Sequence, residues 1–458
     1  MKRLTQLLSL ALLPAIWLPA QAADSAATAA LKARNEMLKP TITQLGERTY
    51  VASGYSPANV SMIVGDDGLI IVDASMMIDH ADAILTEFRK ISTLPIKAVI
   101  LTHGHGDHTG GLPAFTRTQT DGSKPLVYAR LPFNTEGQWF QGAGVTINKM
   151  RGARQGGFLL PPEKRINNGI APAVYPPRKG RVFDGGGAGD HKELFDDERL
   201  TLEVAGVTLE MVAAPGETED QLYVWDAQER IVFTGDNFYR SWPNTYAIRG
   251  TGYRNVMDWI ASLDKMLAEK PIHAVGGHTP PLVGEQETIT TLTNYRDAME
   301  HVFNATIEGI NQGKTPNQLV EDVQLPAHLA KLDYLQEYYG NVRWSVRAIF
   351  QGYMGWFDGN PTQLDSLPPK REAELMLRLA GGEENYRMHA GSALAAGDVQ
   401  WAAQLADHLL VINPDDRDAK FIKAVALETI ADEMLTATGR NYYLTVAQQL
   451  RKEIADSE

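Results

Sequence analysis

The sequence contains no cysteine among its 458 residues. That absence excludes disulfide bonds, iron–sulfur clusters, cysteine-ligated zinc and a thiol nucleophile. Positive charge is also scarce, because 43 Lys and Arg stand against 56 Asp and Glu, for a net charge of -13. Nucleic-acid binding depends on a basic face, so we expect no nucleic-acid partner. After the N-terminal region, no apolar run is long enough and free enough of charge to span a membrane, so we expect no membrane span.

The first 22 residues have the three parts of a secretory signal peptide. Lys2 and Arg3 supply positive charge, residues 4–18 are mostly apolar, and Ala20-Gln21-Ala22 provides small residues for cleavage near Ala22. A membrane anchor is the alternative, but the apolar run is shorter than the roughly 20 residues that a spanning helix needs. We therefore expect an exported protein, either periplasmic or secreted.

Residues 23–284 alternate between short β-rich runs and helical patterns, which is typical of an α/β fold. The clearest local signal is NVSMIVGDDGLIIVDA, residues 59–74, in which two apolar runs flank Asp66-Asp67-Gly68 as in a β-hairpin. We expect helices over residues 79–90 and 256–269, and strands that end near residues 101, 213, 234 and 276. Residues 134–190 are rich in Gly, Pro and Arg and give no clear assignment.

Residues 285–458 lose the strand patterns and show the 3.6-residue periodicity of helices, which predicts an all-α second domain. Residues 396–431 have the alanine spacing and the Asn-Pro-Asp break of tetratricopeptide-like helix pairs. Such pairs bury one face against a neighbour. This half therefore suits either subunit assembly or packing onto the first domain.

The strongest chemical signal is a histidine-rich loop, Thr102-His103-Gly104-His105-Gly106-Asp107-His108, directly after an apolar strand. Imidazole and carboxylate are common metal ligands, and the glycines let the chain turn tightly enough for the side chains to converge. Further ligand-type residues lie beside glycines where later strands are expected to end. The candidate set is His103, His105, Asp107, His108, Glu217, Asp236 and His278.

This set resembles the ligand pattern of the metallo-β-lactamase superfamily, whose fold is an αββα sandwich with a dinuclear site. The resemblance implies one metal ion held by His103, His105 and Glu217, and bridged by Asp236. It implies a second ion held by the remaining ligands, Asp107, His108 and His278. Asp73, at the end of its expected strand, is a candidate for orienting a histidine.

Glu217 stands where most members of the superfamily have histidine, and this narrows the resemblance to the alkyl sulfatases. Asp236 departs from the Glu of that family. Residues 338–369 and 439–451 are similar to the start and end of the alkyl sulfatase dimerisation domain, which implies a homodimer through the helical half. Those sulfatases usually continue into a sterol-carrier-like domain, and this sequence ends at Glu458 before it. The resemblance therefore favours a shorter alkyl or an aryl substrate.

The resemblance implies a zinc-dependent hydrolase that splits a small-molecule sulfate ester into an alcohol and sulfate. Two zinc ions would share a hydroxide as nucleophile, and Asp107 or Asp236 could accept the proton. By position, Asn244 and Arg249 would bind the sulfate group, with Arg254 as a further candidate. Arginine suits this role because its planar guanidinium donates parallel hydrogen bonds to oxyanions.

Three other readings are open. A β-lactam amidase or a phosphoesterase could use the same metal site, although Glu217 and the helical half would then be unexplained. A redox di-iron enzyme of this fold would place a carboxylate where His105 stands. A non-catalytic scaffold with structural metals would gain nothing from an open, water-bearing pair of ions.

Overall fold

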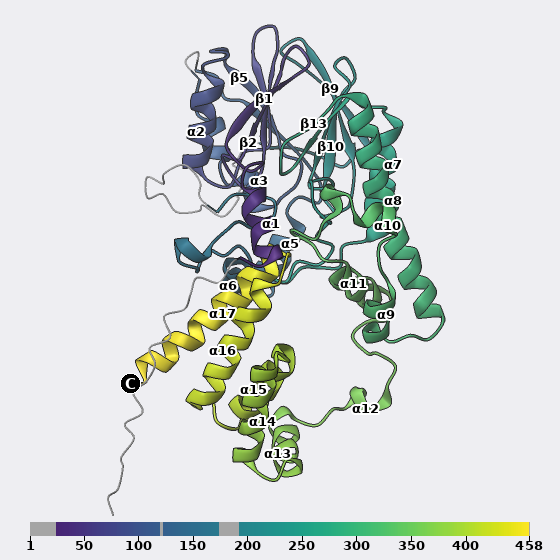
Figure 1. Cartoon of the computed structure of the whole chain (residues 1–458). Coiled ribbons are helices and arrows are strands. Elements are labelled where there is room, and N and C mark those ends of the chain that lie inside the picture. The colour runs from purple at the N-terminus through teal and green to yellow at the C-terminus, as the bar shows by residue number, and fades with distance from the viewer. Residues whose placement is uncertain (1–23, 120–121, 174–191, 458) are drawn as a thin grey trace, which may run out of the picture.

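The computed structural model describes residues 24–119, 122–173 and 192–457. The predicted signal peptide lies outside the described residues. Two mixed β-sheets pack face to face, helices cover their outer faces, and a helical region extends below them (Figure 1). This arrangement confirms the predicted α/β class, an αββα sandwich followed by an all-α region. No described helix has both the length and the apolar character that crossing a membrane requires.

The first sheet has seven strands in sequence order. The strands from β1 to β4 pair antiparallel, and those from β4 to β7 pair parallel. The predicted hairpin is β3–β4, with Ser61 opposite Val72 and Val64 opposite Leu69. The strands are β1 (Thr41–Leu45), β2 (Thr49–Ser53), β3 (Val60–Val64), β4 (Leu69–Val72), β5 (Ile96–Ile100), β6 (Leu126–Arg130) and β7 (Lys192–Phe195).

The second sheet has six strands in the order β13-β12-β11-β10-β9-β8. Only β11 and β12 pair parallel, and the other neighbours in this sheet pair antiparallel. The strands are β8 (Arg199–Val204), β9 (Val207–Ala213), β10 (Leu222–Asp226), β11 (Ile231–Gly235), β12 (His273–Gly276) and β13 (Leu282–Val283).

The central strands are buried on both faces. Every residue of β4, β10 and β11 is buried, because one face meets the opposite sheet and the other meets a layer of helices. One apolar cluster fills the space between the sheets, with Ile70 and Ile100 from the first and Val224 and Phe233 from the second. The strand ends are therefore held rigidly, and the loops that follow them are well positioned.

The described α-helices are distributed over both halves of the molecule. They are α1 (Ala26–Arg34), α2 (Ile78–Phe88), α3 (Gly106–Thr109), α4 (Leu112–Phe115), α5 (Thr135–Gly142), α6 (Ile147–Gln155), α7 (Val256–Ala268), α8 (Glu285–Asn311), α9 (Pro316–Asp322), α10 (Ala327–Ala330), α11 (Val342–Met354), α12 (Pro361–Leu364), α13 (Pro369–Leu379), α14 (Glu383–Ala396), α15 (Val399–Ile412), α16 (Arg417–Asp432) and α17 (Ala437–Asp456).

The helices α8 and α11 belong physically to the sandwich. Their apolar residues join those of α7 and the second sheet in one cluster that runs from Val212 to Phe350 in sequence. A separate, alanine-rich cluster holds α13 to α16 together. The predicted division at residues 284/285 stays a prediction, but α8 begins there and covers the second sheet.

Candidate metal centre

The histidine-rich loop follows β5 at one edge of the sandwich. His103 and His105 precede α3, and Asp107 and His108 lie within that one-turn helix, with His105 at its N-cap position. Gly104 is required by close packing, since a Cβ there would lie 2.6 Å from the Cα of Asn134. The loop is therefore pressed against the residue that precedes α5.

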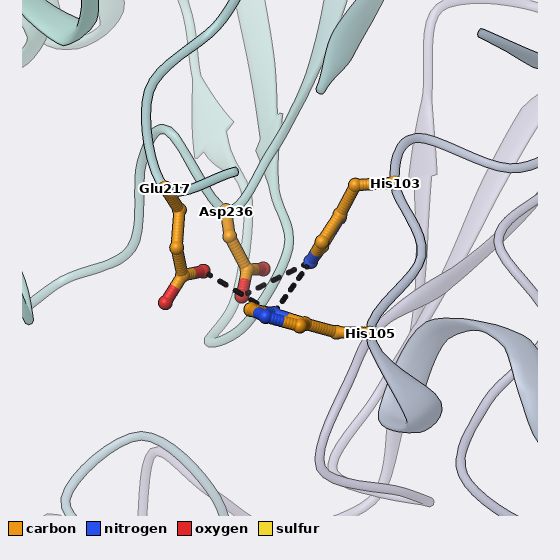
Figure 2. Close-up of side chains that lie close together, drawn as sticks. All are labelled: His103, His105, Glu217 and Asp236. Atoms are coloured by element: carbon orange, nitrogen blue, oxygen red, sulfur yellow. Dashed lines mark hydrogen bonds and ion pairs between the residues drawn. The ribbon is translucent and has the colours of Figure 1, made fainter. Parts of the chain in front are cut away.

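The other candidate ligands come from the second sheet. Glu217 lies in the turn between β9 and β10, Asp236 directly follows β11, and His278 follows β12. Because β11 and β12 run parallel, their carboxyl ends reach the same edge of the sheet. Figure 2 shows Glu217 and Asp236 on one side of the centre, facing His103 and His105 on the other.

The structure brings all seven candidate ligands together in two groups. His103, His105, Glu217 and Asp236 each offer one ligand atom within 4.8 Å of the others. The second group, with the same spacing, is Asp107, His108 and His278. Asp236 also contacts this second group, since its Oδ1 lies 3.0 Å from His108 Nε2 and its Oδ2 lies 3.2 Å from His278 Nε2. This is the placement that a bridging ligand needs, and the ligand roles remain predictions.

The donor set fits a pair of divalent cations. Three buried atoms, His108 Nε2, Glu217 Oε2 and Asp236 Oδ1, make no well-aligned hydrogen bond within the described part of the chain, although His108 Nε2 and Asp236 Oδ1 lie 3.0 Å apart. Leaving a buried ligand atom without a hydrogen bond costs free energy, and a cation would satisfy it. Imidazole and carboxylate without thiolate are ligands that Zn²⁺ accepts.

Asp73 orients the histidine-rich loop. Its Oδ2 lies 2.8 Å from His108 Nδ1, and its Oδ1 accepts a 2.8 Å hydrogen bond from the backbone N–H of Thr102. The Thr102 hydroxyl also lies 3.0 Å from His103 Nδ1. The Nε2 atoms of both histidines are thereby turned toward the centre, as outer-shell partners of metal sites commonly arrange. The sequence predicted this orienting contact for Asp73.

The carboxylates and imidazoles of the centre perturb one another. Burial raises the pKa of Asp236, but the imidazoles of His278 and His108 outweigh it and bring the pKa well below its usual range. Burial raises the pKa of Glu217, partly offset by the guanidinium of Arg254. Burial and the charge of His108 lower the pKa of His103. The pKa values of Asp236 and Glu217 are thus shifted in opposite directions, although both carboxylates belong to the same group of candidate ligands.

Two arginines reach the centre. Arg254 is buried and forms an ion pair with Glu217 Oε1, and it donates a 2.7 Å hydrogen bond to the backbone oxygen of Asn244. Arg249 Nη2 lies 3.3 Å from His105 Nε2. Asn244 is buried beside them, and its backbone N–H donates to the Tyr239 hydroxyl at 2.7 Å. All three predicted sulfate-contacting residues are therefore close to the candidate ligands, and their roles remain predictions.

Glu136 is a site residue that the sequence reasoning missed. It lies in the first turn of α5, 3.1 Å from Arg249 Nη2 and 3.6 Å from His105 Nε2. Burial raises the pKa of Glu136, but His105 and Arg249 together bring it well below its usual range. An acidic residue in a first helical turn is common at any surface, so the sequence offered no signal.

Tyr339 is a second missed residue. Burial and the nearby carboxylates of Glu217 and Asp107 raise the pKa of its phenol, so it stays protonated and can donate a hydrogen bond. Its segment is fixed by a 2.9 Å hydrogen bond from the Tyr339 N–H to the Ser241 hydroxyl. The stretch before α11 thus lies against the loop that follows Asp236.

The C-terminal helix also reaches toward the centre. Asn441, buried on α17, donates hydrogen bonds to the backbone oxygens of Gln155 and Asn167 at 3.3 and 3.1 Å. The side chain of Gln155 in turn accepts a 3.0 Å hydrogen bond from the backbone N–H of Arg249. A chain of hydrogen bonds therefore connects the helical region with a residue beside the metal ligands.

A cavity of about 190 Å³ opens beside Glu217 and Arg254. Trp139 from α5 and Tyr253 from the loop before α7 contribute aromatic surface to its wall. The acidic side chains of Glu136 and Asp220 lie along the same wall. The cavity provides room for a small organic group next to the candidate ligands.

Comparison with known families identifies both halves. A sequence model of the Metallo-beta-lactamase superfamily matches residues 54–278. A second model, described as Alkyl sulfatase dimerisation, matches residues 315–453.

Three similar proteins align with most of the chain. A linear primary-alkylsulfatase from Pseudomonas sp. is 35% identical over 401 residues, which cover 86% of this chain and 74% of that protein. An (R)-specific secondary-alkylsulfatase from Pseudomonas sp. is 28% identical, with coverages of 88% and 61%. The solved structure of a stereoselective inverting sec-alkylsulfatase from Pseudomonas sp. superposes with a TM-score of 0.82 at 26% identity, with coverages of 90% and 66%. The chain thus spans 61–74% of the length of these relatives.

Proposed function

Because the chain belongs to the alkylsulfatase family of the metallo-β-lactamase superfamily, we propose that it is an exported dinuclear zinc hydrolase of sulfate esters. The reaction is R–O–SO₃⁻ + H₂O → R–OH + SO₄²⁻ + H⁺. The observation that carries the proposal is the convergence of seven ligand-type side chains from both sheets, with two arginines beside them.

When bound, the two zinc ions would lower the pKa of a water molecule and stabilise developing negative charge. The chain's own residues hold and move the protons. Asp107, whose side chain is 29% exposed, can accept the proton of the attacking water and pass it to solvent. Asp236 is buried and held ionised, which suits a bridging ligand that also orients the water.

Arg249 is the primary sulfate-binding residue in this proposal. Its guanidinium is a quarter exposed and is held at the edge of the centre by Glu136, so it can donate hydrogen bonds to incoming anionic oxygens. Asn244 adds an amide donor from the same loop. Arg254 fixes Glu217 Oε1 and leaves Oε2 directed toward the metal ligands.

The organic part of the ester would occupy the cavity beside Trp139 and Tyr253. Its volume of about 190 Å³ is below the roughly 300–1,000 Å³ of pockets that enclose drug-sized ligands. Short alkyl and aryl sulfates therefore fit better than long-chain esters.

We also propose that the protein is exported and forms a homodimer. Residues 1–22 would direct export and be removed near Ala22, leaving a periplasmic or secreted protein. The match of residues 315–453 to a dimerisation family supports a homodimer through the helical region.

Sulfate release from a panel of short alkyl, long alkyl and aryl sulfates tests the function, with metal analysis on the same sample. We expect release from short alkyl or aryl esters, together with two zinc ions per chain. A β-lactam and a phosphate ester serve as competing substrates. Hydrolysis of either one, with no release from any sulfate ester, would contradict the proposal.

Hydrolysis in isotopically labelled water then identifies the bond that breaks. Label in the alcohol indicates C–O cleavage, and label in the sulfate indicates S–O cleavage.

A further inference from the structure

The cavity beside the candidate ligands has an acidic wall. Its carboxylates are those of Glu136, Glu217, Glu219 and Asp220. Arg254 is the only cationic side chain that lines it within the described part of the chain, and this guanidinium is already paired with Glu217. Glu136 is paired with Arg249. The wall therefore carries a surplus of negative charge on its two other carboxylates.

Asp220 is the buried member of this surplus. The residue is only 2% exposed, and its Oδ2 accepts a 2.8 Å hydrogen bond from the backbone N–H of Asn134. Among the described residues its Oδ1 accepts no hydrogen bond, and neither Asp220 nor Glu219 forms an ion pair. The N-terminus of α5 supplies only about half a unit of positive charge. A buried carboxylate without a full counter-charge costs free energy, and a cation in the cavity would offset that cost.

The aromatic side chains of the same wall favour a cation as well. Trp139 and Tyr253 line the cavity and are 58% and 45% exposed, so their rings are accessible to a ligand. The face of an aromatic ring attracts a cation, and proteins recognise organic ammonium groups with such rings. Aromatic rings beside carboxylates therefore provide both the apolar contact and the charge that an alkylammonium group needs.

We propose that the preferred substrate is a small sulfate ester whose organic group ends in an ammonium cation. Arg249 lies beside the candidate ligands, where the sulfate group would bind, whereas Glu219 and Asp220 line the cavity that takes the organic group. An ester with a charge of each sign complements both parts. With R as hydrogen or methyl, the reaction is R₃N⁺–(CH₂)ₙ–O–SO₃⁻ + H₂O → R₃N⁺–(CH₂)ₙ–OH + SO₄²⁻ + H⁺. This inference rests on the proposed sulfate ester hydrolysis and adds the chemistry of the organic group.

The test compares two esters of the same shape, 2-(trimethylammonio)ethyl sulfate and 3,3-dimethylbutyl sulfate, which differ by a cationic nitrogen in place of a carbon. The measurement is kcat/KM for sulfate release by the zinc-loaded mature protein, at one ionic strength. We expect the ammonium ester to be favoured about tenfold. Equal values, or a preference for the neutral ester, would overturn this inference and leave the proposed function standing. No release from these or any other sulfate ester would remove the proposed function as well.

A charge variant, Glu219→Gln with Asp220→Asn, then locates the preference. Its amides remove both charges and keep an acceptor for the Asn134 N–H. The control, Asp197→Asn with Glu203→Gln, removes two exposed carboxylates at and before β8, outside the cavity wall. We expect the ratio of kcat/KM between the two esters to fall to about one in the charge variant and to stay at the wild-type value in the control. A folded charge variant that keeps the full ratio would overturn the role of these carboxylates.

The aromatic wall gives a second test that does not depend on the charge variant being folded. Trp139 is exposed, so Trp139→Leu should fold as the wild type does. We expect this change to lower the ratio about threefold, and Trp139→Phe, which keeps an aromatic face, to preserve most of it. Circular dichroism verifies that both variants are folded. An equal ratio in the leucine variant and the wild type would overturn the aromatic contact.

Discussion

The sandwich buries ionisable side chains, whereas the C-terminal helical region leaves large apolar side chains exposed. In the sandwich, ionisable side chains such as His108 and Asp236 are buried completely, and apolar strands close over them. In the region from the end of α11 to α15, large apolar side chains such as Trp356 and Leu379 remain at the surface. Buried ionisable groups without a full set of partners indicate a ligand, whereas exposed apolar groups indicate another protein. The comparison assigns chemistry to one half and assembly to the other.

The largest effect should follow from removing metal ligands in the sandwich. We expect His103→Ala combined with His105→Ala to reduce sulfate release to the uncatalysed rate, because both imidazoles belong to one candidate ion site. Metal analysis should show loss of bound zinc in the same sample. The control, His328→Ala, alters an exposed histidine of the helical half and should leave both activity and metal content unchanged. Full activity in the double variant would contradict the assignment of chemistry to the sandwich.

A smaller effect on activity should follow from changing Asp73, which orients the candidate ligand His108, while the ligand itself is kept. Asp73→Asn replaces the carboxylate beside His108 Nδ1 by an amide. We expect metal affinity or activity to fall about 10- to 100-fold, the range found when such outer partners are lost. Chelator competition measures the affinity directly. The matched variant Asp67→Asn lies in the exposed β3–β4 turn and should behave as wild type.

The hydrogen bonds that connect α17 with Arg249 through Gln155 predict an effect on KM with little effect on kcat. Gln155→Ala removes the acceptor of the Arg249 N–H, and Asn441→Ala removes the donor that fixes Gln155 from α17. We expect each change to raise KM about two- to tenfold, the value of one hydrogen bond, with little change in kcat or zinc content. Gln155→Glu keeps the acceptor and should restore KM. An unchanged KM in both alanine variants would mean that the helical half has no influence on the site.

The smallest effect concerns stability within the helical half. Asp416 caps α16 by accepting the Ala419 N–H at 3.0 Å, and it also accepts a 2.5 Å hydrogen bond from Arg387. Burial raises the pKa of Asp416, but the bond from Arg387 outweighs it and the net shift is downward. Its stabilisation is therefore present above the unfolded pKa of about 4 and lost as the pH falls through the folded pKa.

We expect Asp416→Ala to destabilise the protein by about 1 kcal/mol at pH 7. Denaturant unfolding at pH 7 and at pH 3 measures the difference between wild type and variant. The difference should shrink at pH 3, and an equal difference at both pH values would contradict the charged-cap interpretation.

The sequence predicted the sandwich and the ligand-type side chains that converge in it because their signals are local. The β3–β4 hairpin, the glycine-spaced histidines and the ligand-type residues at strand ends are each recognisable within a few residues. The two missed residues have no such signal. Glu136 resembles any acidic residue in a first helical turn, and Tyr339 stands in a stretch that the sequence reading associated with dimerisation. Both reach the centre through tertiary packing, since Asn134, which precedes α5, packs against Gly104 and the Ser241 hydroxyl accepts a hydrogen bond from the Tyr339 N–H.

Residues 355–368, between α11 and α13, show a second limit of prediction from sequence. Trp356 and two leucines of this segment would ordinarily be expected in a core, because large apolar residues are usually buried. Their exposure becomes visible only when the rest of the chain is placed around them. The alanine spacing and the Asn-Pro-Asp break of residues 396–431 were nevertheless sufficient to predict a helix pair there, and α15 and α16 do contact each other.

The origin of the ligands from both sheets has a thermodynamic consequence. Four candidate ligands follow β5 of the first sheet, and three follow β9, β11 and β12 of the second. An ion bound by such a set binds only when the two sheets are packed together, so zinc availability would enter the folding equilibrium itself. At a free zinc concentration 100 times its dissociation constant, one such site would add about 2.7 kcal/mol to the free energy of unfolding. The protein would then be most resistant to denaturation in the compartment that keeps it loaded.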